Sequence, residues 1–256
     1  MRVLMIGDVI GKPGRRAVKI LIPGLRREHG IDLVIANGEN TAGGFGLTLD
    51  TAYELLDNGV DVLTSGNHIW DQKEILPYLE EGLPVVRPAN YPDAPGRGSL
   101  MHGNVLVINL IGRVFMPALD CPFRTADRLL QEVGTSDSAP VIIVDFHAEA
   151  TSEKQALGWY LDGRVSAVFG THTHVGTTDA RVLPKGTAYI SDVGMTGPVD
   201  SVIGSDIGAV VDRFLTGLPQ RLTVADGPVL MNSVIVDIDR ESGKALTIER
   251  LDRMVN

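Results

Sequence analysis

The sequence predicts an α/β protein in which mixed β-sheets form a sandwich with helices on its outer faces. Short β-branched runs alternate with helical stretches through the first two thirds of the chain, which is typical of strands buried on both faces. After about residue 185 the pattern changes to strands interrupted by one helix. Because no linker rich in Pro, Ser or charge separates the two parts, we expect a single domain over residues 1–256.

The elements of the first part follow from these runs. The clearest helix is predicted over Thr48–Asn58, where apolar residues recur at helical spacing from Leu49 to Leu56 and Gly59 provides a stop. The predicted strands are Arg2–Ile6, Asp32–Ala36, Asp61–Thr64, Val105–Leu110, Val141–Asp145 and Val165–Phe169.

The last part reads as strands over Thr187–Ser191, Val229–Asp239 and Ala245–Leu251, with a helix over Ile207–Leu215. Residues 240–244 contain Ser and Gly and predict a hairpin turn between the last two strands. A sandwich of two mixed sheets with flanking helices accommodates both patterns.

Composition excludes several classes of function. The chain has 23 basic and 32 acidic residues, a formal charge of -9, so its surface repels long nucleic acids on average. Its one cysteine, Cys121, excludes an internal disulfide and a thiolate metal cluster. The apolar run Met1–Ile6 is too short for a signal peptide, and no stretch reaches the ~18 apolar residues of a membrane span. We therefore expect a cytoplasmic protein without a membrane partner; a homo-oligomer is compatible with the sequence.

Polar residues follow several predicted strands at the point where each strand ends. Ligands of α/β proteins bind beyond the carboxyl ends of the strands, so we expect these side chains to converge there. The residues are Asp8, Glu39, Asn40, Asn67, His68, His147, His172 and His174.

This set of carboxylates, carboxamides and imidazoles contains no sulfur, which favours a pair of first-row divalent metals. Two-metal hydrolysis uses ions ~3.5–4 Å apart that activate a bridging hydroxide, and Glu39 is the predicted bridging carboxylate. With Asp8, two divalent ions and the hydroxide, the site carries about +1 and attracts a phosphate ester. In an extended strand His172 and His174 would point to opposite faces, so they share one metal only if the turn rotates them.

Each residue also has a structural interpretation when taken alone. Asp8 is compatible with a helix cap or a turn, Asn67 with a turn, and His147 with a hydrogen-bonded core histidine. Independent placement of every one of them after an apolar strand is the weaker explanation, so we favour a metal site. Capping and solvent exposure account for His29 at a helix end and His102 in a polar turn.

Other nucleotide and hydrolase motifs are absent or incomplete. The glycines from Gly7 to Gly14 have the wrong spacing for a P-loop and for a dinucleotide fingerprint, and no Gly-x-Ser-x-Gly elbow is present. Phe45, within Gly43-Gly44-Phe45-Gly46, is compatible with a mobile lid over a base or with a buried loop anchor.

The order of these motifs resembles that of the calcineurin-like metallophosphoesterases, and in particular their YmdB-type branch, over nearly the whole chain. The resemblance rests on Gly7-Asp8, Gly38-Glu39-Asn40-Thr41-Ala42-Gly43-Gly44, Gly66-Asn67-His68, residues 109–113, His147, residues 170–174 and residues 191–198. It implies an αββα sandwich, two metal ions, and hydrolysis of small phosphodiesters such as 2',3'-cyclic nucleotides. It also implies manganese or iron, with zinc or magnesium as alternatives.

The resemblance further implies a role for each matching residue. Asp8, Glu39, Asn40 and His174 would hold one metal; Glu39, Asn67, His147 and His172 would hold the other. His68 would remain unligated and assist the reaction. Two positions depart from the wider superfamily: its Asp-x-His opening is Asp8-Val9-Ile10 here, and its bridging Asp is Glu39, with Asn40 as the replacement donor.

We therefore expect a phosphodiesterase in which the bridging hydroxide attacks phosphorus in line and His68 protonates the leaving group. Two alternatives stay open at this point. The same metal site would serve a phosphomonoesterase, and a nucleotide-binding regulator would need the site for binding alone.

Overall fold

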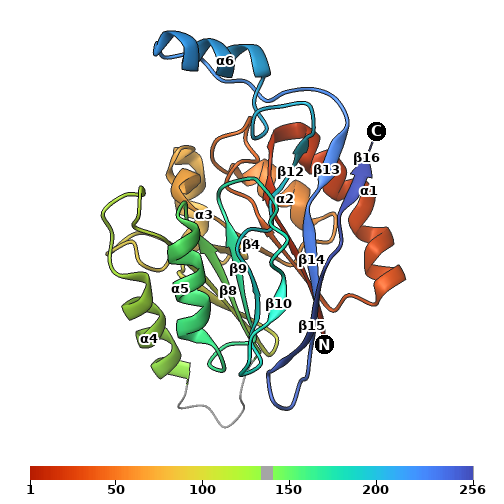
Figure 1. Cartoon of the computed structure of the whole chain (residues 1–256), viewed down its shortest axis with the longest axis vertical. Coiled ribbons are helices and arrows are strands. Elements are labelled where there is room, and N and C mark those ends of the chain that lie inside the picture. Colours follow the sequence, from red (N-terminus) through yellow and green to blue (C-terminus); the bar gives the residue numbers. More distant parts are fainter. Residues whose placement is uncertain (134–140, 256) are drawn as a thin grey trace.

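The computed structural model describes residues 1–133 and 141–255 and contains two six-stranded sheets packed face to face (Figure 1). The first sheet has the order β15-β14-β1-β3-β4-β5. Strands β1, β3, β4 and β5 pair in parallel, and β14 and β15 extend the sheet by antiparallel pairing. From edge to edge the strands are Ala245–Arg250, Ser233–Ile238, Arg2–Ile6, Leu33–Asn37, Val62–Thr64 and Val85–Val86.

The second sheet has the order β10-β11-β9-β8-β7-β6, with parallel pairing from β11 to β7 and an antiparallel strand at each edge. In that order its strands are Arg181–Val182, Ala188–Ile190, Ala167–Thr171, Val141–His147, Val105–Ile111 and Ser99–His102. The carboxyl ends of β8 and β9 therefore lie together, as do those of β1, β3 and β4 in the first sheet.

A third, four-stranded sheet, which the sequence analysis does not anticipate, has the order β16-β13-β12-β2. Its strands are Arg253–Val255, Val229–Met231, Met195–Pro198 and Asp8–Val9. Strand β2 continues the chain just beyond β1 and pairs in parallel with β12, with Asp8 opposite Met195. This pairing fixes Asp8 at the end of the first sheet.

Helices α1 to α5 cover the outer faces of the sandwich (Figure 1). One apolar cluster joins the first sheet to α1, α2 and α3, another joins the second sheet to α4 and α5, and a third fills the space between the sheets. In β1, Leu4 and Ile6 face the helices and Val3 and Met5 face the second sheet, so both faces of the strand are buried. The helices are α1 Gly11–His29, α2 Leu49–Leu56, α3 Leu76–Glu80, α4 Pro122–Val133, α5 Thr151–Leu161 and α6 Ile207–Thr216.

The predicted fold class is confirmed, with corrections to single elements. The run predicted over Val229–Asp239 is two strands, β13 and β14, because the chain passes at Asn232 from the third sheet to the first. The helix predicted over Thr48–Asn58 ends at Leu56, and the Thr48 hydroxyl caps its start by accepting the backbone N–H of Thr51. His102 ends strand β6 in an exposed position instead of lying in a turn.

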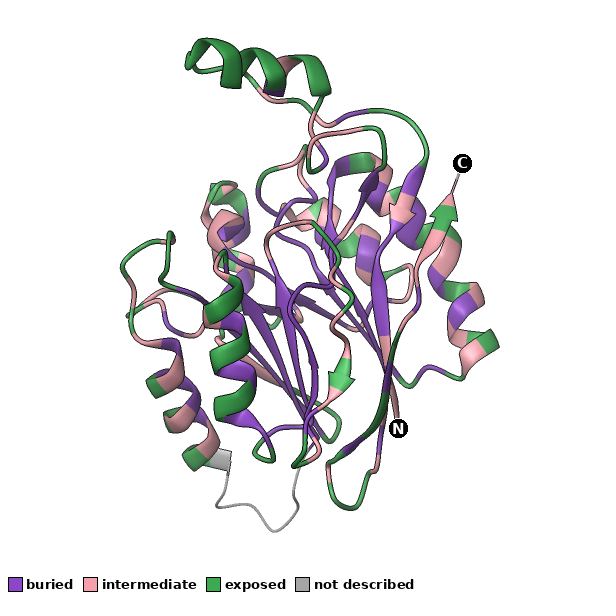
Figure 2. Cartoon of the chain, in the orientation of Figure 1, coloured by how far each residue is buried: buried purple, intermediate pink, exposed green. Residues whose placement is uncertain are grey.

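Helix α6 extends away from the sandwich and is exposed along most of its length (Figure 2). The segment that leads into it, residues 199–206, follows β12 and lies against residues 223–228: the backbone N–H groups of Val199 and Asp206 donate to the carbonyls of Pro228 and Thr223, each over 2.9 Å. Among the described residues, no helix combines the length and the apolar character needed to cross a membrane.

Candidate metal centre

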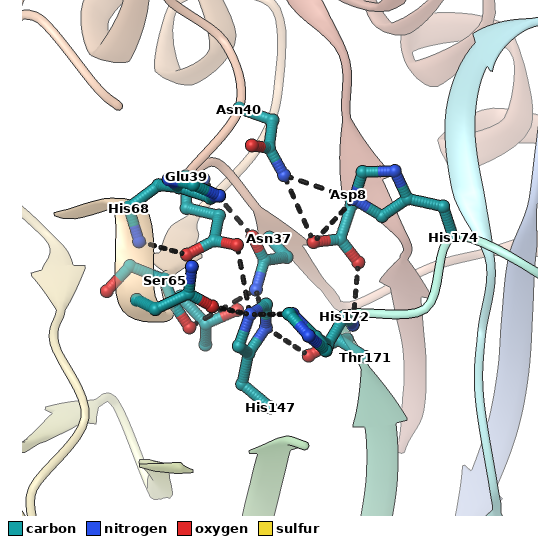
Figure 3. A network of polar contacts seen from close by, with 12 residues as sticks. Asp8, Asn37, Glu39, Asn40, Ser65, His68, His147, Thr171, His172 and His174 are labelled. Carbon is teal, nitrogen blue, oxygen red and sulfur yellow. Dashed lines mark hydrogen bonds and ion pairs between the residues drawn. The ribbon is translucent and has the colours of Figure 1, made fainter. Parts of the chain in front are cut away.

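The polar residues predicted from the strand ends do converge at one edge of the sandwich (Figure 3). They form two groups. The first group consists of Glu39, Asn67, His147 and His172, and the second of Asp8, Asn40 and His174. His68 lies beside the first group (Figure 3).

In the first group, several polar atoms surround a single ring nitrogen. His147 Nε2 lies 2.9 Å from Glu39 Oε1, 3.1 Å from Asn67 Oδ1 and 2.9 Å from His172 Nδ1. The ligand atoms of Glu39, His147 and His172 all lie within 4.8 Å of one another. His147 Nε2 carries at most one hydrogen. That hydrogen cannot form good hydrogen bonds with all three neighbouring atoms, so some of their lone pairs are left without a donor.

A hydrogen-bond chain behind His147 fixes its ring. Thr171 Oγ1 donates to Asp145 Oδ1 over 2.7 Å, and the buried Nδ1–H of His147 donates to Thr171 Oγ1 over 3.0 Å. Burial raises the pKa of Asp145 to about 7, against hydrogen bonds from Thr64 and Thr171 that lower it. This arrangement directs Nε2 of His147 toward the first group, as in metal sites where an outer hydrogen bond orients the histidine.

The donor set fits a divalent cation. Glu39 Oε1 is buried and, despite its short distance to His147, has no partner of adequate hydrogen-bond geometry. Burial acts to lower the pKa of His147, but the Glu39 carboxylate raises it overall, so the surroundings of this ring favour a positive charge. A proton and a metal ion are thus alternative ways to satisfy the same lone pairs.

Gly66 permits the close approach of these side chains. A Cβ atom at this position would lie 2.3 Å from His147 Nε2 and 2.5 Å from Glu39 Oε2. Any side chain would therefore displace the first group, which explains the glycine in Gly66-Asn67-His68. Asn67 begins the short 3-10 helix η1, Asn67–Trp70, directly after the glycine.

The second group is linked through Asp8. Its Oδ1 lies 3.4 Å from Asn40 Nδ2 and 3.7 Å from His174 Nε2, and the last two atoms are 3.2 Å apart. Burial alone would raise the pKa of Asp8, but the hydrogen bond and charge of His174 hold it well below its usual range. Burial likewise opposes protonation of His174, yet Asp8 and the Ile203 carbonyl raise its pKa to about 9.

The two histidines of the 172–174 segment serve different groups because the backbone rotates between them. His172 and His174 both have left-handed backbones, with φ of 99° and 64°, which non-glycine residues rarely adopt. Between them, the backbone N–H and hydroxyl of Thr173 donate to Asp192 Oδ2 over 3.1 and 2.8 Å, and the same oxygen accepts from the buried Lys154 over 2.6 Å. This ion pair holds the rotated segment in place.

His68 does not join either group through its ring. Its Nδ1 lies 2.8 Å from Asp71 Oδ2, and its backbone N–H donates to Glu39 Oε2 over 2.9 Å. The Glu39 carboxylate contacts His147 and the backbone N–H of His68, so its role as a bridge to the second group stays a prediction. The ring of His68 also meets that of Phe45 edge-on, with 5.2 Å between centroids.

Sequence reasoning missed the residues that act through other side chains. Asp71 and Thr171 contact predicted site residues, and Glu149 Oε2 lies 3.0 Å from His172 Nε2. Burial, with the charge of His147, lowers the pKa of His172 to about 3, so this ring is neutral. Only Glu149 has a signal in the sequence, because it lies two residues beyond His147 at the end of a strand.

A cavity of about 280 Å³ opens over both groups. Its floor includes Glu39, Asn40, His172 and His174, and His68 lies in its wall. Of the described residues that line it, none is Lys or Arg. Its apolar lining residues, suited to the face of a nucleobase, are Ile10, Phe45, Ile203, Leu222 and Val224.

Comparison with known proteins adds independent findings. A family model described as YmdB-like protein matches residues 4–251. The chain is 52% identical to a Bacillus subtilis protein named 2',3'-cyclic-nucleotide 2'-phosphodiesterase, over 98% of this chain and 96% of that protein. A Thermus thermophilus crystal structure, described as a hypothetical protein, matches with a TM-score of 0.91, 47% identity and 99% coverage of each chain. A Mycoplasma pneumoniae structure, described as a novel phosphatase, matches with a TM-score of 0.92 and 36% identity over 99% of this chain and 93% of that one.

Proposed function

This chain belongs to the YmdB-like protein family, and from that premise we propose that it is a metal-dependent phosphodiesterase whose substrates are 2',3'-cyclic nucleotides. The predicted class, a phosphoric diester hydrolase, agrees with the name of the Bacillus relative. One observation of the structure carries the proposal. Side chains from both groups of possible metal ligands line a cavity that contains no described Lys or Arg side chain.

Two divalent ions would occupy these groups. Glu39, Asn67, His147 and His172 would hold one ion; Asp8, Glu39, Asn40 and His174 would hold the other. Bound there, the ions supply activation of the attacking water and neutralisation of charge on the phosphoryl group. The nitrogen and oxygen donors suit manganese or iron, with zinc or magnesium as alternatives, and metal analysis of protein purified without added metal distinguishes them.

His68 is the proposed general acid. With Nδ1 bound to Asp71, its Nε2 is the ring nitrogen that remains for a substrate in the cavity. The carboxylate of Asp71 orients the ring through Nδ1, and the backbone contact to Glu39 keeps the residue beside the first group. A proton donated from Nε2 to the departing ribose oxygen completes the hydrolysis.

The charge of the cavity favours a diester over a monoester. A terminal phosphate is a dianion and is commonly bound by Arg or Lys, neither of which lines the described cavity. Glu149 adds a negative charge at the wall. A binding-only regulator does not require the paired His68 and Asp71, so this dyad favours catalysis.

Turnover of a substrate panel tests the proposal. We expect higher kcat/KM for adenosine 2',3'-cyclic phosphate and bis(p-nitrophenyl) phosphate than for p-nitrophenyl phosphate. Each rate should fall on treatment with a chelator and return with added manganese or iron. Faster hydrolysis of the monoester would favour the phosphatase alternative, and tight nucleotide binding without turnover would favour the regulator.

A further inference from the structure

A basic groove adjoins the cavity over the metal centre. One part of it, about 320 Å³ in volume, is lined by Lys12 and Pro13 of the first turn of α1 and by residues 221–226. A second part, about 280 Å³, continues past Lys12 to Arg16 and Asp226. The groove and the cavity share a wall, which consists of Gly43, Leu222, Thr223 and Val224.

The charged side chains that line the groove are mainly basic, whereas those that line the cavity include Glu39 and Glu149 and, among the described residues, no Lys or Arg. Of the described residues that line the groove, the charged ones are Lys12, Arg16 and Arg221, with Asp226 as the one carboxylate. The three basic side chains are exposed, and in the described part of the chain none of them forms an ion pair. In a protein of net charge -9, this is a local concentration of positive charge beside a site that acts on anions.

The start of α1 adds to this field. The helix is 19 residues long, its first turn has no acidic residue, and the side chain of Ile10 provides no cap. The partial positive charge of the helix N-terminus is therefore not offset locally by a carboxylate, and it lies next to Lys12.

We propose that the basic groove binds a second phosphate, so that the enzyme acts on short oligoribonucleotides that end in a 2',3'-cyclic phosphate. This inference rests on the proposed function. In such a substrate the reacting cyclic phosphate and the next phosphate lie on either side of one nucleoside. The shared wall, with the apolar side chains of Leu222 and Val224, separates the two binding regions in the same way.

Glu149 determines on which side of the cavity a second phosphate of the substrate can bind. It lines the cavity and contacts His172, but it does not line the groove. A second phosphate is repelled at the Glu149 side and attracted at the Lys12 and Arg221 side. Long nucleic acids are still disfavoured, because the surface as a whole is acidic.

A comparison of two substrates with the metal-loaded enzyme tests the groove. The substrates are adenosine 2',3'-cyclic phosphate and the dinucleotide ApA with the same cyclic end. We expect kcat/KM to be about tenfold higher for the dinucleotide at low salt, mainly through KM, with the ratio falling toward 1 as salt rises. The double variant Lys12→Ala/Arg221→Ala should bring the ratio near 1 at low salt.

The matched control is Lys19→Ala/Arg27→Ala, which removes the same charge from exposed positions outside the groove. Its ratio should equal that of the parent protein. Equal kcat/KM for both substrates in the parent, or an equal loss in both double variants, would overturn the inference.

A binding measurement separates the groove from the proposed function. If the parent hydrolyses neither substrate, the proposed function fails, and calorimetric titration with the two nucleotides still tests the groove. Tighter binding of the dinucleotide that depends on Lys12 and Arg221 supports the groove independently of turnover. Equal binding of the two nucleotides in the parent contradicts it.

Discussion

The two donor groups are held in different ways, although they lie side by side. The first group has His147 as the last residue of β8, and its ring is fixed from behind by Thr171, the last residue of β9. The second group combines Asp8 of the short strand β2 with two residues outside the strands. Asn40 lies in a turn, and the ring of His174 is held by the backbone carbonyl of Ile203, from the segment that leads into α6.

This difference predicts that the two proposed metal positions are not equivalent. The ring of His147, fixed by a buried hydrogen-bond chain, is already oriented before metal binds, whereas the ring of His174, held by a loop carbonyl, requires additional ordering. We therefore expect the ion of the first group to bind more tightly. The second group is the one that can respond to movement of the segment before α6.

The largest expected effect comes from Glu39→Gln, because this residue is the proposed ligand common to both ions. The change removes one negative charge from a buried site, so both metal occupancies should fall and kcat should drop by roughly 10³-fold or more. Metal analysis and turnover on one preparation measure both quantities. Glu74→Gln, at an exposed position outside the cavity, is the control.

Asp8→Asn sharpens the comparison, since it should empty the second group and leave the first partly occupied. If the Glu39→Gln variant retains two ions and full turnover, Glu39 is not the ligand that bridges them. Equal loss of both ions in Asp8→Asn would contradict independent support of the two groups.

His68→Ala should have the next largest effect and should leave both groups intact. We expect the same metal content as the parent and a loss of about 10²–10⁴ in kcat on a 2',3'-cyclic nucleotide. The loss should be smaller with bis(p-nitrophenyl) phosphate, because p-nitrophenolate needs little protonation to leave. Rates on the two substrates, metal content and Tm are the measurements.

Two other outcomes would change the role of His68. Similar losses on both substrates with full metal content would make it a charge stabiliser instead of a proton donor. A fall in metal content would contradict its place outside both groups.

The sequence predicts the donors of this site but not their support. Each donor lies at the end of a strand or just beyond one, and parallel strands bring their carboxyl ends together, so convergence is predictable. The assignment of His172 and His174 to different groups is not, because it depends on left-handed backbones held by Asp192 and Lys154 from elsewhere in the chain. Strand alternation alone leaves that choice open.

The third sheet shows the same limit at the level of the fold. Strand β2 has two residues and β12 has four, too few for a period to be recognised, and they become strands by pairing with each other. The main strands are longer and buried on both faces, so their apolar runs are visible in the sequence. Contacts between distant segments, such as the one between Thr171 and His147, have no local pattern.

Thr171→Val has the smallest expected effect and tests the support of the first group most directly. Valine has nearly the same shape but lacks the hydroxyl that links His147 to Asp145, so the imidazole loses the acceptor that fixes its orientation. We expect affinity for the first ion to fall by about 10–100-fold, whereas affinity for the second ion changes much less. Chelator titration with metal analysis, performed on metal-loaded protein, separates the two ions. Thr171→Ser restores the hydroxyl and should recover most of the affinity, a rescue that a packing defect would not show. Unchanged affinity for the first ion in the valine variant would mean that the backbone of the strand, without the hydroxyl of Thr171, orients His147. The difference between the two groups would then come from the position of the backbone alone.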